Sequence, residues 1–283
     1  MRTLQEMTLQ EKLGQRLAAG FQGLEPPEEF LRLIKEYKVG NIILFRRNIQ
    51  DGPQLKKLCA TLRKVVEEET GVTPFITIDQ EGGVVTRLPE SEVNIPGAMA
   101  VAATGNPRNA YDMGLLTAQE LRSCGVDFDL APVMDINCNP DNPVIGVRSY
   151  GDTPERVAEY GSQMVRGLLD GGVYCSLKHF PGHGDTAVDS HLGLPCIDRS
   201  FDELMQRELK PFIAGIEAGA PAVMTTHILF PQIEPEHIPA TMSRRIMTGL
   251  LREKLGFGGI IISDCMEMDA IIKFYGTVNG VLA

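Results

Sequence analysis

Two kinds of segment alternate along the chain. Short apolar runs rich in β-branched residues predict buried strands, and longer stretches with apolar residues three or four positions apart predict helices. The strand pattern occurs at 17–21, 41–45, 74–79, 126–135, 173–180, 222–227 and 259–264. The helical pattern occurs at 8–18, 27–37, 52–69, 107–124, 153–171, 200–219 and 243–255. Regular alternation of this kind predicts an α/β fold with a parallel sheet and crossover helices.

The number of strand and helix units favours a TIM-type (β/α)8 barrel, which typically uses about 250 residues as one domain. No break in composition interrupts the 283 residues, so we expect residues 1–283 to form a single domain. Only 265–283 follow the seventh strand, and the barrel is therefore expected to lack its eighth β/α unit at the C-terminus. A barrel without this unit has two unpaired edge strands, through which two copies of the chain could associate. An open doubly wound sheet that binds nucleotides is disfavoured, because no glycine-rich phosphate motif follows a strand.

Composition narrows the range of partners. The net charge is −10 and no basic tract is present, which argues against nucleic acid or an anionic membrane as the main partner. No run reaches the ~18 apolar residues that a membrane span needs, and the N-terminus has no signal-peptide pattern. We therefore expect a cytoplasmic protein. The six scattered cysteines are expected to be reduced thiols in or near the core.

Polar residues end five of the predicted strands: Asp79, Asp135, Lys178 with His179, His227 and Asp264. In a barrel the carboxyl ends of the strands meet at one face, so this pattern predicts a shared site. Asp135 has a second interpretation as the N-cap of the next helix. Asp264 could be a nucleophile, a general base or a metal ligand. The spacing of the nearby histidines fits no metal motif known to us, so we expect no metal.

The segment 176–195 is dense in titratable groups, with three of the five histidines of the chain. In it, Asp189 lies two residues before His191, close enough to orient and polarise the imidazole as in hydrolytic triads. His183, in P-G-H-G-D, either takes part in the chemistry or braces a rigid turn. In the loop after the fourth strand, Arg148 could hold a polar ligand or pair with Asp152.

Five sequence segments together resemble one family. They are G-N-I-I-L-F-R-R-N at 40–48, I-D-Q-E-G-G-V-V-T-R-L at 78–88, V-I-G-V-R-S-Y-G at 144–151, K-H-F-P-G-H-G-D at 178–185 and I-I-S-D-C-M-E-M at 261–268. On these segments the chain resembles glycoside hydrolase family 3, and within it the bacterial single-domain β-N-acetylglucosaminidases. The resemblance runs from the N-terminal helix to about residue 280.

The resemblance implies a retaining exo-glycosidase without a cofactor. Asp264 would be the nucleophile, and His191 paired with Asp189 would be the acid/base. The residues that hold the sugar would be Asp79, Arg148, Lys178 and His179. The substrate would be an N-acetylglucosamine-containing oligosaccharide or muropeptide, from cell-wall fragments or chitooligosaccharides.

Three alternatives stay open. A neutral imidazole acid adds no second anion beside Asp264, so phosphate could replace water and make the enzyme a phosphorylase. A β-glucosidase of the same fold is another. Because relatives of this type continue into a last strand after the motif A-G-x-D, the third is a truncated, inactive sugar-binding chain.

Overall fold

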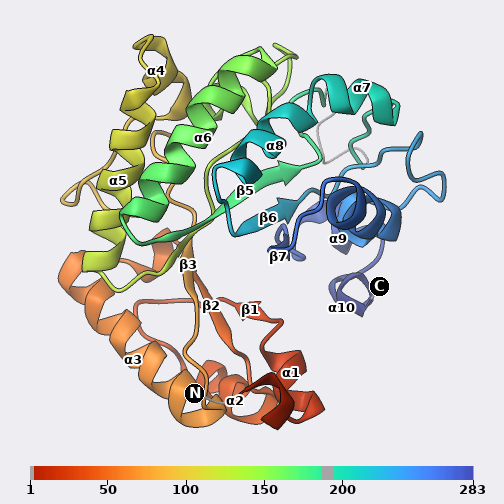
Figure 1. Ribbon diagram of the computed structural model, residues 1–283. Helices are drawn as coiled ribbons and strands as arrows, with labels where there is room; N and C mark the ends of the chain where they lie inside the picture. Colours follow the sequence, from red (N-terminus) through yellow and green to blue (C-terminus); the bar gives the residue numbers. More distant parts are fainter. Residues whose placement is uncertain (1–2, 187–193, 283) are drawn as a thin grey trace.

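The computed structural model describes residues 3–186 and 194–282, and its centre is a seven-stranded parallel sheet. The strands are β1 Ala18–Ala19, β2 Asn41–Leu44, β3 Ile76–Ile78, β4 Phe128–Asp129, β5 Tyr174–Phe180, β6 Ala222–Thr225 and β7 Ile260–Ser263. Each strand pairs with the next one in sequence, and the sheet curls into a half-barrel (Figure 1). The predicted α/β fold and all seven predicted strands are therefore confirmed.

Helices cover the outer face of this sheet (Figure 1). The α-helices of the described residues are α1 Leu9–Gly14, α2 Glu28–Tyr37, α3 Gly52–Thr70, α4 Ala98–Ala103, α5 Arg108–Ser123, α6 Pro154–Asp170, α7 Phe201–Gln206, α8 Leu209–Glu217, α9 Asp269–Ile272 and α10 Thr277–Leu282. A π-helix occupies Arg245–Lys254, where an α-helix was expected. None of the described helices is both long and apolar enough to cross a bilayer.

Local sequence signals set several of the helix ends. Thr8 caps α1 by accepting a hydrogen bond from the amide of Glu11, whose carboxylate accepts one from the amide of Thr8 in return. Asp51 caps α3 through the amide of Gln54, at 2.8 Å. Gly71 ends α3 with φ +72°, a conformation that glycine adopts without strain.

Two predicted elements are divided or shortened in the structure, and one helix was not predicted. The helix expected at 200–219 is divided into α7 and α8, because the backbone of Arg207 leaves the helical conformation at φ −130°. The strand expected at 126–135 is regular only over β4, since Pro132 has no amide hydrogen for a strand ladder. Helix α4 lies at 98–103, where the sequence pattern predicted no element.

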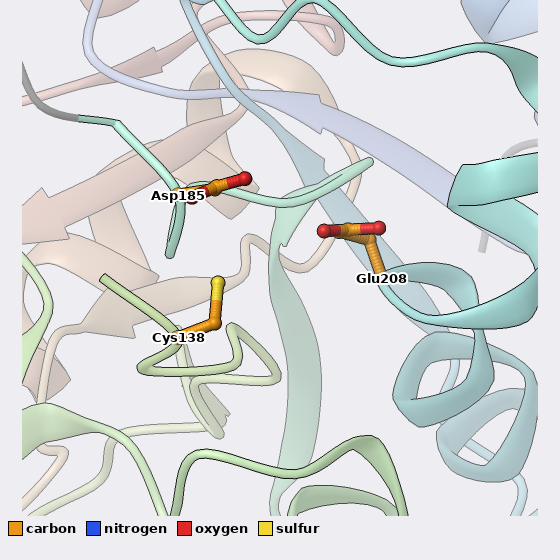
Figure 2. Close-up of side chains that lie close together, drawn as sticks. All are labelled: Cys138, Asp185 and Glu208. Atoms are coloured by element: carbon orange, nitrogen blue, oxygen red, sulfur yellow. The ribbon is translucent and has the colours of Figure 1, made fainter.

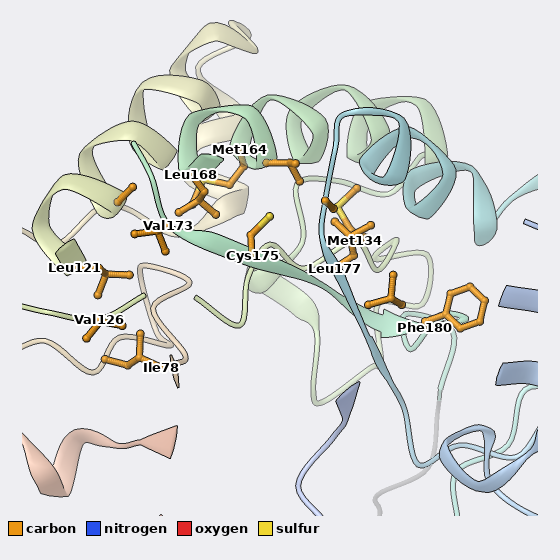
Figure 3. Close-up of a cluster of buried hydrophobic side chains, with 14 of the residues drawn as sticks. Ile78, Leu121, Val126, Met134, Met164, Leu168, Val173, Cys175, Leu177 and Phe180 are labelled. Atoms are coloured by element: carbon orange, nitrogen blue, oxygen red, sulfur yellow. The ribbon is translucent and has the colours of Figure 1, made fainter. Parts of the chain in front are cut away.

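The main core lies between the sheet and the helices that pack on it, and Figure 3 shows its part around β5, α5 and α6. Cys175 and Leu177 of β5 are fully buried and belong to the same hydrophobic cluster as Leu121 of α5 and Leu168 of α6. Burying side chains of this size stabilises a fold by about 1.5–3 kcal/mol each. The strand ends at the carboxyl face are therefore held by a rigid frame.

All six cysteines are free thiols. Four are buried or half-buried, as expected, but Cys196 and Cys265 are exposed, which corrects the expectation of core positions. Cys265 lies two residues after β7, and Cys196 lies between β5 and α7.

Candidate active site

A buried ion network lies at the carboxyl ends of β3 and β5. The ammonium of Lys178, only 2% exposed, lies 2.8 Å from Oδ1 of Asp79 and 2.6 Å from Oε1 of Glu81. On its other side Glu81 accepts two hydrogen bonds from the guanidinium of Arg148, at 2.9 Å from Nε and 2.7 Å from Nη2. A two-pronged pair of this kind fixes both position and orientation.

The network keeps its members charged. Burial alone would raise the pKa of Glu81, but Lys178 and Arg148 outweigh burial and lower this pKa to about 2. The pKa of Asp79 is lowered in the same way, chiefly by Lys178. Burial opposes the charge on Lys178, yet the two carboxylates raise its pKa. The site therefore presents fixed charges without any reorganisation.

A glycine turn holds Glu81 in place. Gly82 and Gly83 have φ +87° and +58°, and the amides of Glu81 and Gly82 both donate to the carbonyl of Val85. A Cβ on Gly83 would lie 2.7 Å from the Cα of Gly97. Only glycine fits between the turn and the start of α4, so the turn is rigid.

Asp135 orients the histidine next to Lys178. Its Oδ2 lies 2.7 Å from Nδ1 of His179, and its Oδ1 accepts a hydrogen bond from the amide of His183 at 2.7 Å. A carboxylate at Nδ1 makes that nitrogen the donor and leaves Nε2 for other partners. Burial opposes ionisation of Asp135, but the interaction with His179 lowers its pKa. Asp135 is not the helix cap, because Thr153 stands at that position of α6.

His183 lies in the rigid turn, as expected of a brace. Its ring Nδ1 is 3.2 Å from the hydroxyl of Thr186, and its carbonyl accepts a hydrogen bond from Asn142 at 2.9 Å. A Cβ added to Gly184 would overlap the carbonyl oxygen of Ile136. The loops after β4 and β5 are thus joined through main-chain contacts.

Asp264 follows β7 and is half-buried. Its amide donates to the carbonyl of Thr225 at 3.1 Å, and its Oδ1 accepts a hydrogen bond from the amide of Cys265 at 2.7 Å. Burial lowers the pKa of His183 and of His227, and the negative charge of Asp264 partly offsets this. The carboxylate of Asp264 is therefore within electrostatic reach of both histidines.

The structure thus brings together most of the residues predicted from the sequence. Asp79 and Lys178 are in direct contact, Arg148 joins them through Glu81, and His179 is the next residue after Lys178. The pairing considered between Arg148 and Asp152 is wrong, since the partner is Glu81. Glu81 had only its place beside two glycines as a sequence signal. Asp189 and His191 lie outside the described residues.

A second cluster, absent from the sequence predictions, is formed by residues of the loops after β4 and β5 and by Glu208 at the start of α8. Figure 2 shows the side chains of Cys138, Asp185 and Glu208 pointing toward one another, and their ligand-type atoms lie within 4.8 Å of one another. Nη2 of Arg207 is 3.1 Å from the sulfur of Cys138, 3.0 Å from Asp185 and 2.7 Å from Glu208. A guanidinium therefore already lies among these three groups, and the cluster links the two loops.

One hollow of the surface is distant from these groups. It measures about 700 Å³, lies between α3 and the end of α5, and is lined by residues such as Lys56, Arg63 and Arg122. None of the residues at the carboxyl ends of the strands lines it. The ion network, and not this hollow, is therefore the candidate site.

A parallel α/β half-barrel with convergent charged groups at the carboxyl ends of its strands is the arrangement of a barrel-type catalytic domain. Residues 8–283 match the family model described as the glycosyl hydrolase family 3 N terminal domain. The chain belongs to this family.

Several named proteins are similar to the chain. A beta-hexosaminidase A from Pseudoalteromonas piscicida is 38% identical over 90% of this chain and 46% of its own length. The structure of a family 3 beta-N-acetylglucosaminidase from Paenibacillus sp. str. FPU-7 superposes with a TM-score of 0.95, at 48% identity, over 98% of this chain and 52% of that chain. The structure of NagZ from Neisseria gonorrhoeae in complex with N-trifluoroacetyl-D-glucosamine has a TM-score of 0.81, at 35% identity, over 89% of this chain and 74% of that chain. The chain thus spans about half the length of the first two.

Proposed function

We propose that the chain is a retaining β-N-acetylglucosaminidase that removes terminal N-acetylglucosamine from oligosaccharides or muropeptides. The main support is the ion network at the carboxyl ends of β3 and β5, in which Asp79, Lys178 and Arg148 are held charged at one face. Beta-hexosaminidases and N-acetylglucosaminidases among the similar proteins support the same activity.

In this proposal the network binds the sugar. Asp79, Lys178, Arg148 and His179 donate to or accept from its hydroxyl groups, and their mutual contacts fix their positions before the ligand arrives. Preorganised groups of this kind lower the cost of binding and stabilise the developing charge of the transition state. His179 is oriented by Asp135, so its Nε2 faces a constant direction.

Asp264 attacks the anomeric carbon and forms the glycosyl–enzyme intermediate, while His191, paired with Asp189, protonates the leaving oxygen. His191 then removes a proton from water, which releases the sugar with its anomeric configuration retained. The proposal for Asp264 is supported by its place at the end of β7, on the same face as the network.

We also propose that residues 1–283 form one domain, which has seven of the β/α units of a TIM-type (β/α)8 barrel and lacks the eighth. Ile260 of β7 is 43% exposed, and among residues 3–186 and 194–282 strand β7 pairs only with β6. An eighth β/α unit, or a second copy of the chain, would cover this edge.

The decisive experiment is mass spectrometry after reaction with a slow 2-deoxy-2-fluoro or 5-fluoro glycosyl donor. We expect the label on the peptide that contains Asp264. Asp264→Asn should remove the label and lower hydrolysis of an aryl β-N-acetylglucosaminide on the order of 10³-fold or more. Full activity in this variant would refute the nucleophile. Rates with and without phosphate separate a hydrolase from a phosphorylase, and an aryl glucoside tests the glucosidase alternative.

A further inference from the structure

An apolar pocket adjoins the ion network on the outer side of Glu81 and Arg148. It has a volume of about 460 Å³ and lies between the glycine turn, helix α4 and the 3₁₀ turn Gly146–Arg148. Glu81 and Arg148 are the polar side chains that line it. The other lining residues are glycine, alanine, valine and methionine, among them Val84, Met99 and Val147.

The pocket exposes apolar side chains in a way that folding does not require. Val84 is 72% exposed, Val147 is 51% exposed and Met99 is 37% exposed, and all three border the same hollow. Single exposed apolar residues are ordinary, but a group of them around a concave surface marks a binding site.

The walls of this pocket are formed in advance. The glycine turn that carries Val84 is packed against Gly97, where a Cβ on Gly83 would lie 2.7 Å from Cα. The amide of Gly83 donates to the carbonyl of Ile95 at 3.0 Å, which fixes the other side of the turn. Val147 precedes Arg148, which the pair with Glu81 holds in place. The pocket therefore needs no rearrangement of its walls to bind a ligand.

The polar groups of the pocket are already satisfied. Glu81 accepts from Arg148 and pairs with Lys178, and Nη1 of Arg148 donates to the carbonyl of Val144 at 3.2 Å. The two charges are therefore balanced within the network. The pocket therefore favours an uncharged, apolar group over an ion or a second sugar, whose hydroxyls would lose their hydrogen bonds to water.

We propose that this pocket is an apolar subsite that receives an alkyl or aryl group attached to the sugar bound by the ion network. The inference rests on the proposed function, because Glu81 and Arg148 are the shared wall between the sugar site and the pocket. A volume of about 460 Å³ fits a small-molecule group, within the usual range of roughly 300–1,000 Å³ for ligand pockets. The side chains of Val84 and Val147 determine the preference of this subsite for apolar groups.

The test uses N-acetylglucosamine derivatives that cannot be hydrolysed. One series carries S-linked alkyl chains of increasing length at the anomeric carbon, and the other carries O-linked alkyl chains at C6. Isothermal titration calorimetry gives the Kd of each. In one of the two series we expect binding to tighten about threefold to fourfold for each added methylene until the pocket is full. The series that shows this gradient identifies the position on the sugar that faces the pocket.

The double variant Val84→Ser/Val147→Ser should bind the methyl derivative as the unchanged chain does and lose most of the gradient. Both side chains are largely exposed, so folding should be unaffected, and thermal unfolding checks this. Val278→Ser is the matched control, because Val278 is 71% exposed and lies outside the pocket. It should keep the full gradient.

The outcomes separate the two proposals. If neither methyl derivative binds, the sugar site itself is refuted and the subsite with it. If one binds but neither series shows a gradient, the subsite alone is refuted. A gradient that persists in the double valine variant would also refute the subsite, since the apolar group would then bind elsewhere.

Discussion

The β3–β5 side of the candidate site and its β7 side are built differently. On the β3–β5 side, Lys178 is buried between two carboxylates, and Glu81 forms an ion pair with Arg148. On the β7 side, Asp264 is half-buried and accepts one hydrogen bond, from the amide of Cys265, among the described residues. Strand β5 is buried along nearly its whole length, whereas no residue of β7 is fully buried. The residues proposed to bind the sugar are thus part of the buried interior, whereas the proposed nucleophile lies at its partly exposed edge.

The largest difference should appear on removing the central cation. Lys178→Met leaves Asp79 and Glu81 as buried carboxylates without their shared partner. We expect the free energy of unfolding, measured by urea titration, to fall by about 3–5 kcal/mol. Adding Asp79→Asn and Glu81→Gln to the same variant should restore part of this loss, because the uncompensated charges are then gone.

The matched substitution on the other side is Asp264→Asn. It should change the free energy of unfolding by no more than about 0.5 kcal/mol, since Asp264 belongs to no buried ion pair among the described residues. Similar losses in the two variants would contradict the comparison between the two sides.

Acid should reduce the stability contributed by the β3–β5 side, by a smaller amount than the loss expected for Lys178→Met. The pKa of Glu81 is lowered from 4.5 to about 2 in the folded protein, so its contribution to stability is present above pH 4.5 and is lost as the pH falls through about 2. A shift of this size corresponds to about 3 kcal/mol. We expect the difference in unfolding free energy between the unchanged chain and Glu81→Gln to shrink by about this amount over that range.

Glu253→Gln is the control for the acid titration, because it removes an exposed carboxylate. Its difference from the unchanged chain should stay nearly constant with pH. A constant difference for Glu81→Gln as well would show that Lys178 and Arg148 do not favour the ionised form of this carboxylate.

The smallest expected change at a buried carboxylate is a gain in stability. Asp129 lies fully buried beside the network, accepts a hydrogen bond from the amide of Gln80 at 2.9 Å, and has a second oxygen without a partner. Burial raises its pKa well above the usual value. The folded state therefore binds a proton that the unfolded state releases, and stability falls as the pH rises above 3.8.

Asp129→Asn keeps the shape and the acceptor but has no proton to gain. It should raise the free energy of unfolding by about 1 kcal/mol at pH 7, and the gain should disappear toward pH 4. Chemical unfolding at both pH values measures this. A loss of stability at pH 7 would mean that the ionised form of Asp129 is the one that the fold requires.

The sequence predicted the strands, their order and the polar residues that end them, because buried parallel strands are continuous apolar runs and polar groups after them are conspicuous. It could not assign the partner of Arg148, since Glu81 is 67 residues away and only the paths of two loops bring them together. The break at Arg207 was missed for a similar reason. Its side chain is held by Cys138 and Asp185, which are remote in sequence, and helical periodicity says nothing of such contacts.

The strict sequential order of the sheet has a consequence for biosynthesis. Each strand pairs with the one made just before it, so the sheet can extend as the chain leaves the ribosome. Asp79, Glu81 and Lys178 all precede β6 and β7, and the ion network can therefore close while the segment with Asp264 is still being translated, several seconds later at the usual rate of about 5–20 residues per second. A nascent chain whose β5 has left the ribosome while β7 is still to be made would contain Asp79, Glu81 and Lys178 but not Asp264.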